Sequence, residues 1–138
     1  VLEERDRRGA RANRDLYRQD PATVMAELPA ASEVNLEQVE LTRLFLVLQT
    51  ESLQGDDKVR AWFVDRRRRL QDQIAAVLRD GVERGDFRAD LDPDVKATEI
   101  ICMLDGAHLQ HLVAPDEVDL LEVLSSYRDA LVADLRPT

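Results

Sequence analysis

The 138-residue chain has few of the residues that would indicate a disulfide-stapled, secreted or membrane protein. Its single cysteine, Cys102, excludes an internal disulfide framework and favours a reducing compartment. No apolar run approaches the roughly 20 residues that cross a bilayer, and the opening VLEERDRRGARANRD is too charged to be a signal peptide. We therefore expect a soluble, cytoplasmic protein.

Positive charge is also in deficit, with 19 Lys and Arg against 28 Asp and Glu and a formal net charge of −9. Binding to phosphates requires clustered positive charge, so the composition argues against a nucleic-acid surface in these residues. Four consecutive arginines, residues 66–69, are spread roughly 100° apart around a helix. This spread predicts that the arginines form a solvated face. A nucleic-acid contact and a contact with a partner protein are the alternatives.

Aromatic residues are scarce, at 4% of the chain, and the β-branched runs typical of strands are missing. Helix-forming residues dominate instead, and only five Gly and five Pro interrupt them. The apolar spacing predicts an all-α bundle of about six helices in one domain, 1–138. The expected helices cover 1–19, 21–29, 35–54, 56–85, 93–113 and 117–135.

Turn and cap residues set the expected helix ends. Pro21 begins the second helix and Pro29 ends it. Gly85 stops the long fourth helix. Asp92 caps the fifth helix and Asp116 the last one.

Reactive side chains recur every third residue in ICMLDGAHLQH, residues 101–111, as Cys102, Asp105, His108 and His111. Each step of three falls about 60° short of a full helical turn, so the four cannot converge on one metal ion. The Cys102 thiol and His108 lie on different faces of the helix. His108 therefore cannot act as the base beside a thiol nucleophile. A metal-binding or enzymatic helical protein stays an alternative, but we expect no enzyme activity, metal or cofactor.

Two other features are more informative. Gly106 lies inside this helix, where glycine costs about 1 kcal/mol relative to alanine, so it predicts close approach of another helix or a ligand. Trp62 and Phe63 form the densest aromatic position. They are interpreted first as core, and alternatively as the wall of a ligand cavity.

One set of residues in the second half of the chain forms a recognisable motif: Gly85-Asp86, Asp90 to Pro93, Ala97, Ile100, Asp105, Gly106 and Gln110. With this motif the chain resembles the C-terminal part of a tetracycline-repressor-like (TetR family) transcriptional regulator. The resemblance includes upstream similarity at Glu51-Ser52 and in the opening VLEERDRR, which is similar to the family's connecting helix. The family's three-helix DNA-binding domain has no counterpart here, so operator DNA would be bound only through a domain absent from this sequence.

The resemblance implies a homodimer in which the helices at about 93–113 and 116–135 pair into a four-helix interface. The implied interface residues are Gly106, Leu109, Gln110, Val113, Leu121, Leu124, Tyr127 and Leu131. It also implies a cavity for a small, largely apolar effector among the middle helices. The implied cavity residues are Leu44, Phe45, Leu48, Gln49, Trp62, Phe63, Arg66, Cys102 and Asp105. A helical interaction module without a pocket is the remaining alternative.

Overall fold

The computed structural model describes residues 2–31, 39–55 and 57–138, and these are all-α, as predicted. In the described ranges the chain forms α1 (Leu2–Asn13), η1 (Leu16–Arg18), α2 (Pro21–Ala31), α3 (Val39–Glu51), η3 (Ser52–Gln54), α4 (Asp57–Glu83), α5 (Pro93–Val113) and α6 (Leu120–Leu135). None of the helices described here is long and apolar enough to span a bilayer.

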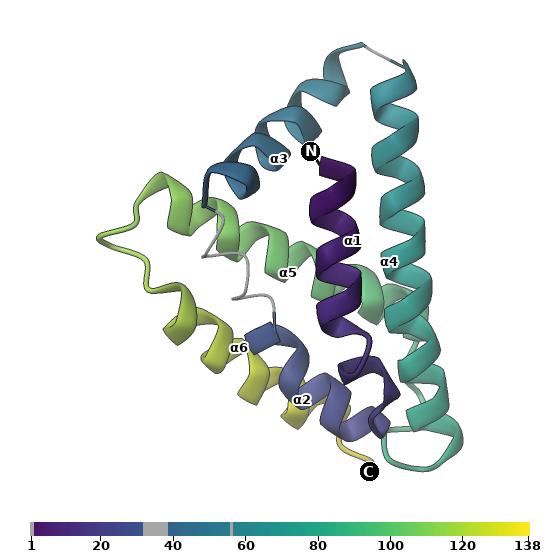
Figure 1. Cartoon of the computed structure of the whole chain (residues 1–138). Coiled ribbons are helices and arrows are strands. Elements are labelled where there is room, and N and C mark those ends of the chain that lie inside the picture. Colours follow the sequence, from purple (N-terminus) through teal and green to yellow (C-terminus); the bar gives the residue numbers. More distant parts are fainter. Residues whose placement is uncertain (1, 32–38, 56) are drawn as a thin grey trace.

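The two long helices α4 and α5 frame the molecule (Figure 1). They pack together near the turn that joins them, and α5 then runs to the opposite end of the molecule. There the chain turns back into α6, which packs along α2. Helix α1 lies in front, between α3 and α4 (Figure 1).

The main core joins α2, α4, α5 and α6. Its fully buried side chains lie at helical spacing on each element, and burying each large one contributes roughly 1.5–3 kcal/mol. The largest are Val24, Met25, Ile74, Leu78, Ile100, Leu131 and Leu135. Along α4, Phe63, Ile74 and Leu78 are buried, whereas Val59 near its start is exposed.

Helix ends follow the predicted caps at most positions. The Asp92 carboxylate accepts hydrogen bonds from two backbone N–H groups of the first turn of α5, as expected of an N-cap. The prediction for α6 is wrong by three residues: Asp119, not Asp116, accepts from the Glu122 N–H. Residues 114–118 form a separate turn that delays the start of the helix.

Proline gives a second correction. Helix α2 begins at Pro21, as predicted, but it continues through Pro29 to Ala31. A proline removes one helical hydrogen bond and opposes the turn before it. Here Pro29 is buried and lies in the last turn, two residues before α2 ends, so few helical hydrogen bonds remain to be disrupted.

The turn after α4 depends on two glycines. Gly85 has φ +80°, the left-handed conformation that ends a helix, and it stops α4 as predicted. Gly81 lies inside the helix, and a Cβ there would overlap the ring of Phe87. The Gly81 carbonyl also accepts from the Phe87 N–H, at 3.1 Å. The turn therefore folds tightly back onto α4.

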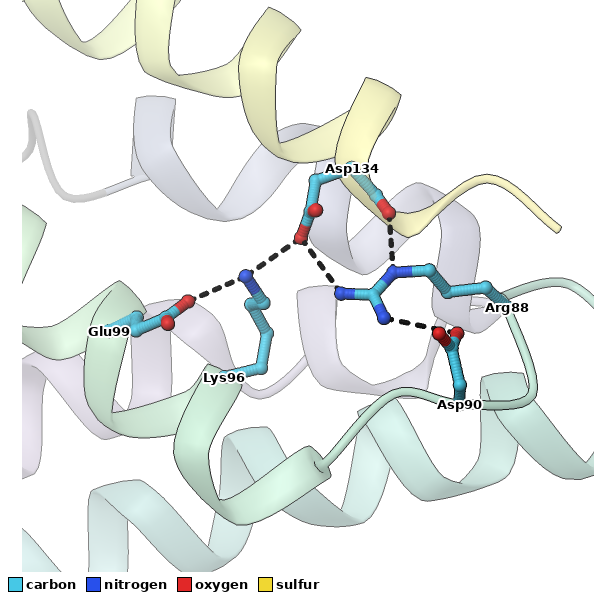
Figure 2. Close-up of polar contacts among 5 residues, drawn as sticks. All are labelled: Arg88, Asp90, Lys96, Glu99 and Asp134. Atoms are coloured by element: carbon cyan, nitrogen blue, oxygen red, sulfur yellow. Dashed lines mark hydrogen bonds and ion pairs between the residues drawn. The ribbon is translucent and has the colours of Figure 1, made fainter. Parts of the chain in front are cut away.

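A polar network fixes the end of α6 against the start of α5 (Figure 2). The Lys96 ammonium lies 2.7 Å from the Asp134 carboxylate and also contacts Glu99. Arg88, in the α4–α5 turn, donates to the Asp134 backbone carbonyl at 2.8 Å and to Asp90 at 3.1 Å. The hydrogen bond from Lys96 is the main reason that the pKa of Asp134 lies below its ordinary value of 3.8.

Candidate functional site

Three aromatic rings meet between α3 and α4. Phe45 of α3 lies 5.3 Å from Phe63 and 6.5 Å from Trp62 of α4, measured between ring centroids. All three pairs are edge-to-face, the arrangement that the ring quadrupoles favour. Phe45 and Phe63 are buried and Trp62 is half-buried. The structure thus brings together three of the residues expected to line a cavity.

Arg66 joins this aromatic cluster (Phe45, Trp62 and Phe63) to a third helix. Its guanidinium carbon lies 4.3 Å from the centre of the Phe45 ring, a cation–π contact. Its Nε lies 3.0 Å from both carboxylate oxygens of Asp6 in α1. Only 25% of the Arg66 side chain and 19% of the Asp6 side chain are exposed. One arginine therefore contacts α1 and α3 from its position on α4.

A hollow of about 300 Å³ lies beside the cluster. Trp62 forms one wall, Asp6 another, and Glu3, Arg7 and Arg69 complete it. This volume is at the lower end of the roughly 300–1,000 Å³ typical of small-molecule sites. The aromatic wall suits an apolar group, and the charged rim suits a polar one.

The other residues expected from α3 do not all face this region. Leu48 and Gln49 are half-buried, whereas Leu44 is 42% exposed. Leu44 follows Arg43 on the outer side of the helix, about 100° from the buried Phe45. In the chain as described Leu44 is therefore turned away from the buried Phe45, and its place in a cavity stays a prediction.

The two cavity residues expected from α5 have different surroundings. Asp105 is half-buried, but Cys102 is exposed. Cys102 lies in a different hollow, a groove of about 590 Å³ between Gln71 of α4 and Val95 and Met103 of α5. This groove is not the hollow that Trp62 lines, and the place of Cys102 in an effector cavity stays a prediction.

Both histidine rings hydrogen-bond to backbone carbonyl groups. The Nδ1 of His108 lies 2.7 Å from the Leu104 carbonyl, and that of His111 lies 2.7 Å from the Val118 carbonyl. Each ring donates to a carbonyl oxygen and stabilises α5 or the turn after it. Within the described ranges, no three His, Cys, Asp or Glu side chains gather where they could hold a metal ion. The geometry gives the metal and enzyme alternative no support.

An apolar face of α5 is exposed along the whole helix. Val95, Leu109 and Val113 are 54%, 46% and 72% exposed, and Met103 lies on the same side. Gly106 is in the middle of this face, and no atom lies within 4 Å of where its Cβ would be. Among the described residues no helix approaches Gly106 there, so the close approach inferred from the sequence does not occur within this part of one molecule.

The expected interface residues of α6 divide into two groups. Leu121 is 48% exposed, and Gln110 on α5 is exposed as well. Leu124 and Leu131 are buried inside the chain, at 1% and 3% exposure, and their place on an interface stays a prediction. Tyr127 is half-buried, and burial is the main cause that raises the pKa of its hydroxyl.

Comparison with known proteins found one family. Residues 24–135, from α2 to the end of α6, match the family model described as BetI-type transcriptional repressor, C-terminal. No curated protein and no solved structure matches the chain.

Proposed function

Because this chain belongs to the family of C-terminal domains of BetI-type, TetR-like transcriptional repressors, we propose that it binds a small effector and forms a homodimer. The effector is a molecule with a largely apolar body. Operator DNA is bound through a separate DNA-binding domain of the intact regulator, which acts in the cytoplasm.

The aromatic cluster with Arg66 is the observation that carries the effector proposal. Three rings and a guanidinium lie together between α3 and α4, and Trp62 of this cluster lines the hollow beside it. Ligand sites commonly combine an apolar, aromatic wall with a few polar groups that fix orientation. Glu3, Asp6, Arg7 and Arg69 supply such groups on the rim.

The same residues connect the site to α1, which is similar to the family's connecting helix. An effector placed against Phe45 would compete for the ring face that Arg66 covers, at 4.3 Å. Displacing Arg66 would weaken its ion pair with Asp6. An effector can shift an equilibrium only by binding its two states differently. Without effector Arg66 pairs with Asp6, and with effector bound this ion pair is weakened, so the two states differ in their contacts.

The chain's only tryptophan allows a direct test, because Trp62 belongs to the cluster. We expect anilinonaphthalene sulfonate, an aromatic probe with a charged group, to change Trp62 fluorescence saturably at about one molecule per chain. Phe45→Leu keeps an apolar side chain but removes the ring, and should weaken binding about tenfold, or about 1.4 kcal/mol.

Leu53→Ala is the matched control, since Leu53 is an apolar residue that is 71% exposed. It should leave the probe's affinity unchanged. Equal affinity for the wild type and Phe45→Leu would contradict the proposed site.

The exposed face of α5 supports the dimer. Four exposed apolar residues lie on the same side of α5 as Gly106, and Leu121 of α6 adds to the exposed apolar area. Exposed apolar residues grouped on one side of a helix are typical of an isologous interface, where the same surface contacts itself.

A further inference from the structure

Two helix faces meet at the hollow beside Trp62. The residues on the α4 face are spaced i, i+4 and i+7 and those on the α1 face i, i+3 and i+4, the spacings of side chains on one side of a helix. The α4 residues are Trp62, Arg66 and Arg69, and the α1 residues are Glu3, Asp6 and Arg7. All of them except Arg66 line the hollow.

The charges on these two faces do not balance. Asp6 and Arg66 neutralise each other across the gap, with the Arg66 Nε 3.0 Å from both carboxylate oxygens. Of the other charged side chains that line the hollow, Arg7 and Arg69 are cationic and Glu3 is acidic. The hollow therefore has an excess of positive charge, in a chain whose formal net charge is −9.

Both arginines of the lining have partners that a ligand could replace. Arg7 pairs with Glu4 at 3.1 Å, and Arg69 pairs with Asp65 at 3.2 Å, each along its own helix. All four side chains are at least 42% exposed, and exposed pairs of this kind contribute little to stability. Glu4 also contacts Arg8 at 3.2 Å, so it would keep a cationic partner if Arg7 turned toward a ligand.

We propose that the effector is an aromatic carboxylate, with its ring against Trp62 and its carboxylate between Arg7 and Arg69. This proposal rests on the proposed effector site and specifies the charge of the molecule. Guanidinium groups bind carboxylates through charge-assisted hydrogen bonds, and the indole ring offers an apolar surface beside them. The bound carboxylate would join α1 to α4, the helices that Asp6 and Arg66 already connect.

Three ligands that share one ring system test the charge: 2-naphthoate, 2-naphthalenemethanol and 2-naphthylmethylammonium. In calorimetric titrations of the full 138-residue chain, the carboxylate should bind about tenfold more tightly than the alcohol, and the cation most weakly.

Variants of the lining residues assign the effect to its source. Arg7→Gln and Arg69→Gln should each remove most of the difference between carboxylate and alcohol, because the alcohol makes no charge-assisted contact. Glu3→Gln should strengthen carboxylate binding, since it removes the acidic side chain from the lining. Arg68→Gln is the matched control: Arg68 is exposed on α4 next to Arg69 but lies outside the lining, so the three affinities should stay unchanged.

Two results would overturn the anionic effector and leave the site standing. They are equal affinities for carboxylate and alcohol, and tightest binding of the cation, each with Phe45→Leu still weakening the binding. If none of the three ligands binds to the wild-type chain, the proposed site and the charge assigned to its effector are both overturned.

Discussion

At the residue scale, two glycines inside helices have different roles. The sequence marks Gly106 as the unusual one, because it interrupts an otherwise apolar helix. Within one chain, however, Gly81 is the glycine that has no room for a side chain, because the Phe87 ring lies against it. Sequence reasoning missed Gly81 because the close neighbour comes from a turn whose path is set only when the chain is folded.

Gly81→Ala should therefore destabilise the fold, although alanine is the better helix former. A methyl group placed against Phe87 forces the ring or the turn to move, and overpacking of this kind costs about 1–3 kcal/mol. Urea unfolding followed by circular dichroism measures the loss. Gly106→Ala is the control: its Cβ has open space, so we expect unchanged or higher stability. Equal effects of the two substitutions would contradict the packing argument.

The candidate site was partly predictable for a related reason. Trp62 and Phe63 could be identified from the sequence as the densest aromatic position, and the family resemblance placed Phe45 with them. The Asp6–Arg66 pair joins positions 60 residues apart, and nothing in the local pattern of α1 indicates it.

At the element scale, the helices were predicted well wherever cap chemistry and apolar spacing agree. Asp92 and Gly85 mark two ends correctly, since a carboxylate before a proline and a left-handed glycine each act within one turn. Asp116 was the wrong choice for α6 because two aspartates three residues apart offer the same chemistry. The choice of Asp119 depends on the turn at 114–118, which His111 stabilises from α5.

The last turn of α6 provides a pH-dependent prediction. Asp134→Asn removes the charge that Lys96 and Arg88 share, and should cost about 1 kcal/mol at pH 7, a modest value because the carboxylate is partly exposed. The pKa of Asp134 is lowered in the folded state, so its contribution is complete above the ordinary value of 3.8 and is lost as pH falls through the lower folded value.

Thermal melting at pH 7 and at about pH 3 measures this dependence. The difference between the wild type and Asp134→Asn should shrink at the lower pH. Asp90→Asn is a useful comparison, since Asp90 is far more exposed, at 80% against 43% for Asp134, and contacts Arg88 alone. A difference for Asp134→Asn that stays constant with pH would contradict the assigned role.

At the scale of the whole molecule, a substitution at Gly106 should affect association without affecting the stability of the fold. Gly106→Leu adds a large side chain where the described residues leave no atom within 4 Å of the Cβ position, so the fold should keep its stability. The same side chain would hold two α5 helices apart, and we expect dimerisation to weaken at least tenfold by sedimentation velocity. Unchanged association would count against a crossing at this residue.

The pairing of α2 with α6 has a consequence for synthesis. Val24, Met25 and Leu28 of α2 share their core with Leu131 and Leu135 of α6, which are made roughly 100 residues later. At about 5–20 residues per second, α2 spends several seconds on the ribosome without its partner. Chaperones that bind exposed apolar segments have that interval in which to engage α2, and the fold closes only after its last helix has emerged.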